Sequence, residues 1–113
     1  MEILLQPLRI PTGWKVEYND GLFEIDPSAT LISPDEHLLF FKEDMLLLMQ
    51  EDRDRLLDVG WYPEGDLQNG EYAIHLHCHD GLGRLLQEFR TRDRRTLIAE
   101  IERVLFAVTE GHM

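Results

Sequence analysis

The sequence has little of several things, and each shortage excludes a class of protein. Its 113 residues include a single cysteine, Cys78, which excludes an internal disulfide framework and predicts a reducing, cytoplasmic setting. No apolar run approaches the roughly 18–20 residues that a membrane-spanning helix needs. Residues 1–7 carry no basic region before their short apolar stretch, so we expect no signal peptide. The length suits one domain over residues 1–113, with an N-terminal arm over residues 1–11.

Basic residues are also scarce. The chain has 22 Asp and Glu against 11 Lys and Arg, a net charge of −11. Residues 1–83 hold 17 acids and 5 bases, a charge of −12, whereas residues 84–113 hold 5 acids and 6 bases, a charge of +1. Such a chain repels phosphate backbones, so we expect neither a nucleic acid nor an anionic membrane as partner. The excess of acids favours solubility or attraction to a basic protein partner.

Several segments alternate apolar and polar residues with period two, which predicts β-strands. These segments are residues 14–18, 22–26, 57–62, 71–78 and 84–90. Asn19-Asp20-Gly21 has turn chemistry and predicts a hairpin between the first two segments. The segments at 55–62 and 71–78 are expected to pair as an antiparallel hairpin across a long loop.

The middle of the chain permits two interpretations. Ser33-Pro34-Asp35-Glu36 is a good helix start, with a capping serine and a glutamate three residues later. We prefer a short helix over residues 34–42 followed by a strand over 44–50. The alternative is that the helix continues, because Leu and Met recur there with helical spacing.

The last element is predicted to be an amphipathic helix over residues 92–109. Thr91 is a plausible N-cap, Asp93 would lie in the first turn, and Gly111 follows the end. The apolar stripe that would pack on the sheet consists of Leu97, Ile98, Ile101, Leu105 and Val108. The fold class is therefore α+β: an antiparallel sheet of about five to six strands with the C-terminal helix and the short middle helix packed on one face.

Three histidines, His75, His77 and His79, alternate along one predicted strand and so share one face. Cys78 points to the other face and is expected to be a small buried side chain. The spacings typical of zinc sites are missing, so we favour solvated histidines and expect no metal and no cofactor. Only two serines exist, and no catalytic arrangement is present, so we expect no enzyme. The alternative is a small metal-binding or hydrolytic protein that uses this histidine face.

Arginine clusters late in the chain. Six of the nine arginines fall within residues 84–103, and Arg92, Arg94 and Arg95 are predicted to occupy the first turn of the last helix, where the helix dipole disfavours cations. We expect these side chains to pair with acids elsewhere in the fold. The alternative is an anion-binding edge.

Acidic and aromatic residues gather in the predicted loops between strands. Trp61 shares a face with Leu57 and Val59 and is expected in the core, whereas Tyr62 is expected at the surface as an interface anchor. The candidate residues for binding a basic protein partner are Glu51, Asp52, Asp54, Tyr62, Glu64 and Asp66.

Several short strings resemble one family. They are Gly13-Trp14-Lys15-Val16 with Tyr18-Asn19, Phe23-Glu24-Ile25-Asp26-Pro27, Asp58-Val59-Gly60-Trp61-Tyr62-Pro63-Glu64, Gly70-Glu71-Tyr72 and Glu88-Phe89-Arg90-Thr91-Arg92. Over residues 12–108 the chain resembles the small acidic bacterial immunity proteins of polymorphic or contact-dependent toxin systems. The resemblance implies a cytosolic binder that occludes a toxin domain, often a basic nuclease. It implies no catalytic residues, and the histidine face has no counterpart in it.

Overall fold

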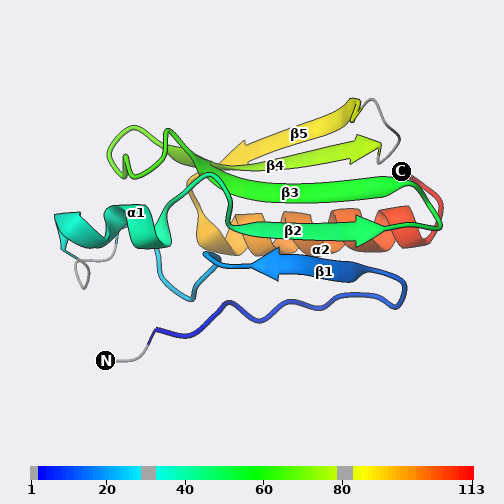
Figure 1. Cartoon of the computed structure of the whole chain (residues 1–113), viewed down its shortest axis with the longest axis horizontal. Helices are drawn as coiled ribbons and strands as arrows, with labels where there is room; N and C mark the ends of the chain where they lie inside the picture. The colour runs from blue at the N-terminus through cyan, green and yellow to red at the C-terminus, as the bar shows by residue number, and fades with distance from the viewer. Residues whose placement is uncertain (1–2, 29–32, 79–82) are drawn as a thin grey trace.

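The protein forms a five-stranded antiparallel sheet with one long helix against it (Figure 1). The computed structural model describes residues 3–28, 33–78 and 83–113. The strands follow one another in space as they do in sequence, so the sheet is a simple meander: β1 (Lys15–Asn19), β2 (Leu46–Gln50), β3 (Arg55–Tyr62), β4 (Glu71–Cys78) and β5 (Leu85–Thr91). The long helix is α2 (Arg94–Thr109). The α+β class is confirmed, with five strands.

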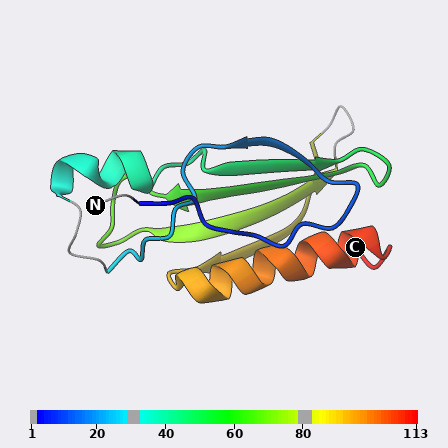
Figure 2. The same ribbon diagram turned by 90° about the horizontal axis from the view of Figure 1, so that it is seen from below.

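The core lies between α2 and one face of the sheet (Figure 2). The apolar side chains of β3 and β4 alternate onto that face, where Leu57, Val59 and Trp61 are all fully buried. The helix stripe meets them as predicted, since Leu97, Ile101 and Leu105 are fully buried. The pairing of β3 with β4 brings Trp61 opposite Tyr72, and their rings stack edge to face with centroids 4.9 Å apart.

The ends of α2 show how local sequence sets its length. The predicted N-cap Thr91 is wrong: the cap is Asp93, whose carboxylate accepts a hydrogen bond from the backbone N–H of Thr96. Thr91 belongs to β5 instead, and its hydroxyl accepts a bond from the Asp93 N–H. At the other end Gly111 has a φ of +82° and donates to Val108, while His112 donates to Ala107. This pair of bonds is a Schellman motif, for which glycine is suited because it lacks a Cβ.

The predicted hairpin between residues 14–18 and 22–26 is wrong. Strand β1 pairs with β2, not with the segment that follows it, and Phe23 makes only an isolated bridge with Leu5. The reason is the burial pattern: Leu22 and Ile25 are both buried, and a spacing of three cannot lie on one face of a strand. The turn after β1 is tied to β2 instead, because Asp20 N–H donates to the carbonyl of Met45.

The middle segment resolves in favour of the preferred interpretation. A 3₁₀ turn, η1 (Pro34–Glu36), leads into one turn of helix, α1 (His37–Phe40), and β2 follows. Glu36 completes the predicted capping interaction by accepting from the N–H and the hydroxyl of Ser33. Residues 46–50 are a strand because they are buried between neighbouring strands β1 and β3. Helix α1 lies beyond the ends of β2 and β3 (Figure 1).

Candidate functional site

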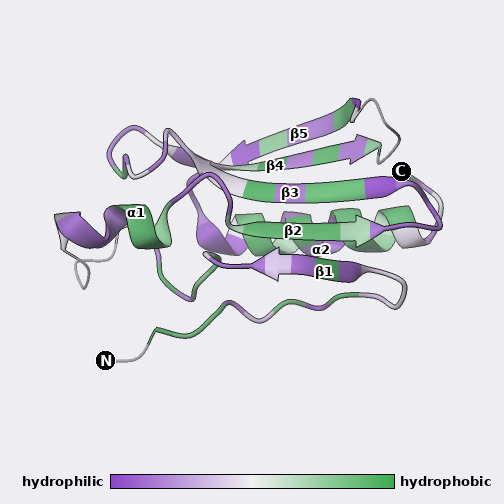
Figure 3. Cartoon of the chain, viewed as in Figure 1, coloured by the Kyte–Doolittle hydropathy of each residue, from purple (hydrophilic) through white to green (hydrophobic). Residues whose placement is uncertain are grey.

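The face of the sheet opposite α2, which we call the open face, is covered by no described helix (Figure 2). The strand register places one residue of each strand in a row across it: Tyr18, Leu47, Asp58, His75 and Glu88. The first four of these side chains are half-buried and Glu88 is exposed. Along β4 and β5 hydrophilic residues alternate with hydrophobic ones (Figure 3). The open face is therefore a polar, partly desolvated surface, unlike the apolar face under α2.

Asp58 lies in the middle of that row. Its Oδ1 atom is buried and has no hydrogen-bond partner among the described residues. Burial raises the pKa of the carboxyl, the nearby charge of Asp44 raises it further, and His75 and His77 oppose the shift. A buried carboxylate oxygen without a donor costs free energy, so Asp58 is not explained by the stability of the fold.

Two further acids reach the open face because of Gly60. Segment 42–45 runs beside β3, with bonds from Trp61 N–H to the Lys42 carbonyl and from Met45 N–H to the Val59 carbonyl. Between these bonds the backbone of Glu43 passes so close over Gly60 that any Cβ at that position would collide with the Glu43 carbonyl. Glycine therefore permits the crossing, which sets Glu43 and Asp44 among the residues of the open face.

Two tyrosines flank these acids. Tyr18 lies on β1 and Tyr62 at the end of β3, and both are half-buried. Burial first, and then the charge of Asp58, Glu43 and Asp44, raises the pKa of Tyr62 to about 12. Burial and the charge of Asp44 and Asp58 raise the pKa of Tyr18 as well. Both hydroxyls thus sit in a negative potential; the hydroxyl of Tyr18 interacts with the carboxylate of Asp44, and that of Tyr62 can donate a hydrogen bond to a partner. We call the set Tyr18, Glu43, Asp44, Asp58 and Tyr62 the acidic tyrosine patch.

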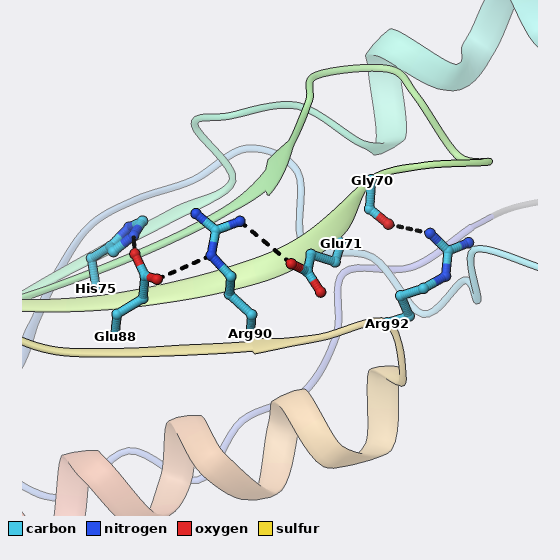
Figure 4. Close-up of polar contacts among 6 residues, drawn as sticks. All are labelled: Gly70, Glu71, His75, Glu88, Arg90 and Arg92. Atoms are coloured by element: carbon cyan, nitrogen blue, oxygen red, sulfur yellow. Dashed lines mark hydrogen bonds and ion pairs between the residues drawn. The ribbon is translucent and has the colours of Figure 1, made fainter.

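Next to the patch a polar chain links β4 and β5 (Figure 4). His75 Nε2 lies 2.8 Å from Glu88 Oε2, and Glu88 Oε1 accepts from Arg90 Nε at 3.1 Å. The guanidinium of Arg90 lies 3.5 Å from Glu71 and packs over the ring of Tyr62, with 5.9 Å to its centroid. These bonds hold the pKa of Glu88 below its usual range. The basic residue beside the patch is thus already engaged by two glutamates and does not neutralise Asp58.

The histidines do not assemble a metal site within the described part of the chain. His75 is bonded to Glu88, and His77 Nδ1 lies 3.1 Å from the carbonyl of Gly83. In residues 3–28, 33–78 and 83–113 no group of three His, Cys, Asp or Glu could hold a metal ion. His79 lies outside the described residues. Cys78 is buried on the opposite face, as predicted, with the Arg84 guanidinium 3.4 Å from its sulfur.

The predicted partner-binding residues divide between two ends of the molecule. Glu51, Asp52 and Asp54 lie in the turn between β2 and β3, whereas Tyr62, Glu64 and Asp66 lie where β3 ends and in the loop beyond it. The eight residues of β3 separate the groups by about 24 Å. The structure therefore does not bring the six residues together.

Of the second group, Tyr62 lies on the open face, and Glu64 approaches the patch, since its carboxylate accepts from the backbone N–H of Glu43. Asp66 instead holds the loop: its carboxylate accepts from Asn69, and its carbonyl accepts from the indole N–H of Trp61 at 2.9 Å. Sequence reasoning missed Tyr18, Glu43, Asp44 and Asp58 as site residues. Nothing local indicated that segment 42–45 would cross the face on which Tyr62 lies.

Arg92 and Arg94 are bound to the protein itself. Arg92 donates to the carbonyls of Gly70 and Leu67 and lies over the Trp61 ring, which fastens the β3–β4 loop (Figure 4). Arg94 is bonded to Asp26 at 2.8 Å. Arg92 precedes α2, so it is not in the first turn as predicted. The expected pairing with acids elsewhere is confirmed for Arg94 and is wrong for Arg92, which binds carbonyl groups; for Arg95 it stays a prediction.

In the part of the chain that the structure describes, no helix is long and apolar enough to cross a membrane. Comparison of the chain with protein-family models, with curated proteins and with solved structures gives no match.

Proposed function

We propose that this protein is a non-enzymatic protein-binding module, and most concretely an immunity protein that neutralises a cognate bacterial toxin by occluding it. The observation that carries the proposal is the acidic tyrosine patch on the open face. A half-buried aspartate whose buried Oδ1 has no donor among the described residues, on a face that it shares with two tyrosines, is the arrangement expected where a partner supplies the missing donor.

The chemistry of the patch defines the partner. Asp58, Glu43 and Asp44 gather negative charge in one patch. A lysine or arginine from the partner would reduce the repulsion between these charges as it binds. Tyr18 and Tyr62 offer large side chains with few rotatable bonds, which lose little entropy when a partner covers them. The net charge of −11 extends the same preference to the whole molecule. The partner is thus a basic protein domain, as the resemblance to immunity proteins implies.

The test uses the product of the gene adjacent to this one as the partner. We expect the variant Glu43→Lys/Asp44→Lys to slow association several-fold at low salt and to lose most of that difference at high salt, because exposed charges act on the association rate and are screened beyond roughly 8 Å at physiological ionic strength. Tyr62→Ala should act on the dissociation rate and raise the Kd by tenfold or more.

The matched control is Glu51→Lys/Asp52→Lys, which makes the same change of charge at the far end of β3. We expect it to slow association less than the patch variant does, because the two turns are about 24 Å apart. No binding to the neighbour's product, or an association rate indifferent to salt and to both variants, contradicts the proposal. If both variants slow association equally, the net charge of the whole molecule attracts the partner, and the acidic tyrosine patch has no special part in binding.

A second candidate function, that of a metal-binding or hydrolytic protein using His75, His77 and His79, stays a prediction. It is tested by titrating the untagged protein with zinc: stoichiometric binding lost in His75→Ala and His77→Ala favours it over the binding module.

A further inference from the structure

The two edges of the sheet differ in how they are protected. An edge strand presents unpaired backbone N–H and C=O groups that can pair with another strand. At one edge β1 has five residues and its register with β2 is interrupted between Val16 and Tyr18. Such an irregularity discourages further pairing. At the other edge β5 has seven residues, and Figure 1 shows no strand beyond it. Its register with β4 is interrupted near its start, between Leu85 and Gln87, and is regular from Gln87 to Thr91.

Strand β5 is exposed along most of its length. Leu85 and Leu86 at its start keep 49% and 39% of their surface accessible, and only Phe89 and Thr91 are half-buried. The side chains of Glu88 and Arg90 lie on the open face, and Phe89 lies between them on the face toward α2. The accessible leucines precede the regular part of the strand, so residues 87–91 are the part of this edge that can pair with another strand.

The order of residues in β5 specifies which strand could pair with it. When two copies of one strand pair antiparallel about a two-fold axis, residues opposite each other must point to the same face of the sheet. The axis therefore lies between the two copies of one residue, and the residues on either side of it face each other across the pair. With the axis at Phe89, each Glu88 faces the Arg90 of the other copy, and the two phenylalanines face each other. With the axis at Glu88 or at Arg90, like charges face each other instead. One register alone matches both charges and pairs the aromatic rings.

We infer that β5 is a homodimerisation edge: residues 87–91 pair antiparallel with the same residues of a second copy, centred on Phe89, to form a continuous ten-stranded sheet. This inference goes beyond the proposed toxin binding and does not depend on it. Glu88 and Arg90 already bond each other within one chain at 3.1 Å, and the second copy adds two reciprocal pairs to that network. Because the paired segment is short and both chains carry −11, we expect a weak dimer with a Kd in the micromolar range or above.

The first measurement is sedimentation equilibrium of the full chain over a concentration series from micromolar to millimolar. We expect the mass to rise from one chain to two. A mass of one chain at every concentration overturns the inference, and so does a dimer that neither Glu88→Arg nor Arg90→Glu weakens.

The decisive measurement uses those two variants separately and mixed. Each variant alone places two pairs of like charges opposite each other in the dimer. We therefore expect its Kd to be at least about tenfold higher than that of the original protein. Mixed in equal amounts, one variant offers two bases and the other two acids, so the mixture should associate where each alone does not. Neither variant restores an ion pair within its own chain, so the recovery reports contacts between copies.

Two controls separate pairing from folding. Glu17→Arg makes the same reversal on the other edge strand and should leave the mass unchanged. Glu88→Gln, which only removes the charge, replaces Glu88→Arg if circular dichroism shows that the reversal unfolds the chain. A mixture no heavier than its components overturns the inference.

Discussion

The two faces of the sheet differ in the polarity and in the hydrogen bonding of their side chains. Beneath α2 Leu57, Val59 and Trp61 of β3 are fully buried, and the indole N–H of Trp61 is bonded to the carbonyl of Asp66; at the start of β3, Arg55 Nε is buried without a partner among the described residues. On the open face the same two strands carry Asp58, Tyr62 and His75, which are half-buried, and an oxygen of Asp58 has no donor among the described residues. The middle of the covered face is apolar and its polar group is bonded, whereas the middle of the open face holds a carboxylate whose buried oxygen adds a cost to folding.

The contrast teaches where function should be sought. Buried polar groups are usually paired, because each unpaired one reduces a net stability of only about 5–15 kcal/mol. An exception that persists on an uncovered surface is explained more simply by a partner than by the fold. We therefore expect substitutions on the two faces to differ, with the largest loss of stability on the covered face.

Ile101→Ala should produce that largest loss, because it removes a fully buried side chain between α2 and the sheet. We expect the free energy of unfolding to fall by about 2–5 kcal/mol in urea. The matched control is Phe106→Ala on the same helix, whose side chain is 43% exposed and should cost much less. Similar losses for the two variants would contradict the placement of the core.

Gly60→Ala tests the point where the chain crosses the open face. Replacing glycine in a strand usually gains about 0.5–1 kcal/mol, but here the added methyl meets the backbone of Glu43. Because backbone cannot rotate away as a side chain can, we expect a net loss of about 1–3 kcal/mol, measured by urea unfolding. A midpoint that is unchanged or higher would mean that segment 42–45 does not cross Gly60.

Asp58→Asn should raise stability, by less than the Gly60 variant lowers it. The pKa of this carboxyl is higher in the folded state than its ordinary value of 3.8, so the folded protein holds a proton that the unfolded chain releases. Stability of the original protein therefore falls as the pH rises through the interval above 3.8. The variant has no such loss, so its advantage in urea midpoint should be absent at low pH and appear as the pH rises.

Asp66→Asn is the control for the direction in which stability changes with pH. Hydrogen bonds from Asn69 lower the pKa of Asp66, so its contribution to stability is present above its ordinary pKa and is lost as the pH falls. The asparagine variant should therefore be less stable than the original protein near neutral pH. If both variants move the midpoint in the same direction, the electrostatic contrast between the open face and the loop is wrong.

Glu43→Lys/Asp44→Lys should give the smallest effect on the fold. Both side chains are exposed, so we expect the free energy of unfolding to change by no more than about 0.5 kcal/mol. The same variant is expected to slow association with the basic partner several-fold. A large change in stability would show that these acids serve the fold and would remove the distinction between the faces.

Much of the covered face could be predicted from the chain. The alternation in residues 57–62 and 71–78 identified strands, and it placed Trp61 in the core and Tyr62 on the other face. The apolar stripe of the last helix was equally clear, because a period of 3.6 sustained over sixteen residues is typical of an amphipathic helix and of no strand. Local pattern succeeds where one periodicity decides which side of an element meets the core.

Local pattern failed where long-range contacts compete. The turn at Asn19-Asp20-Gly21 suited a hairpin, yet β1 pairs with β2 some thirty residues later, because β2 is buried between two strands and the segment after the turn is not a regular strand. The predicted partner-binding residues do not lie together for a related reason: the two acidic segments that contain them are at opposite ends of β3.

The amino-acid sequence by itself determined the strand and helix periods, the acidic charge and the absence of a disulfide framework, because these follow from residue identity and spacing alone. Tertiary structure decided which face of the sheet stays uncovered, that the backbone of Glu43 and Asp44 crosses Gly60 to join Asp58, and which edge strand is left exposed. Those features depend on contacts between residues far apart in the chain, whose free energy no local pattern contains.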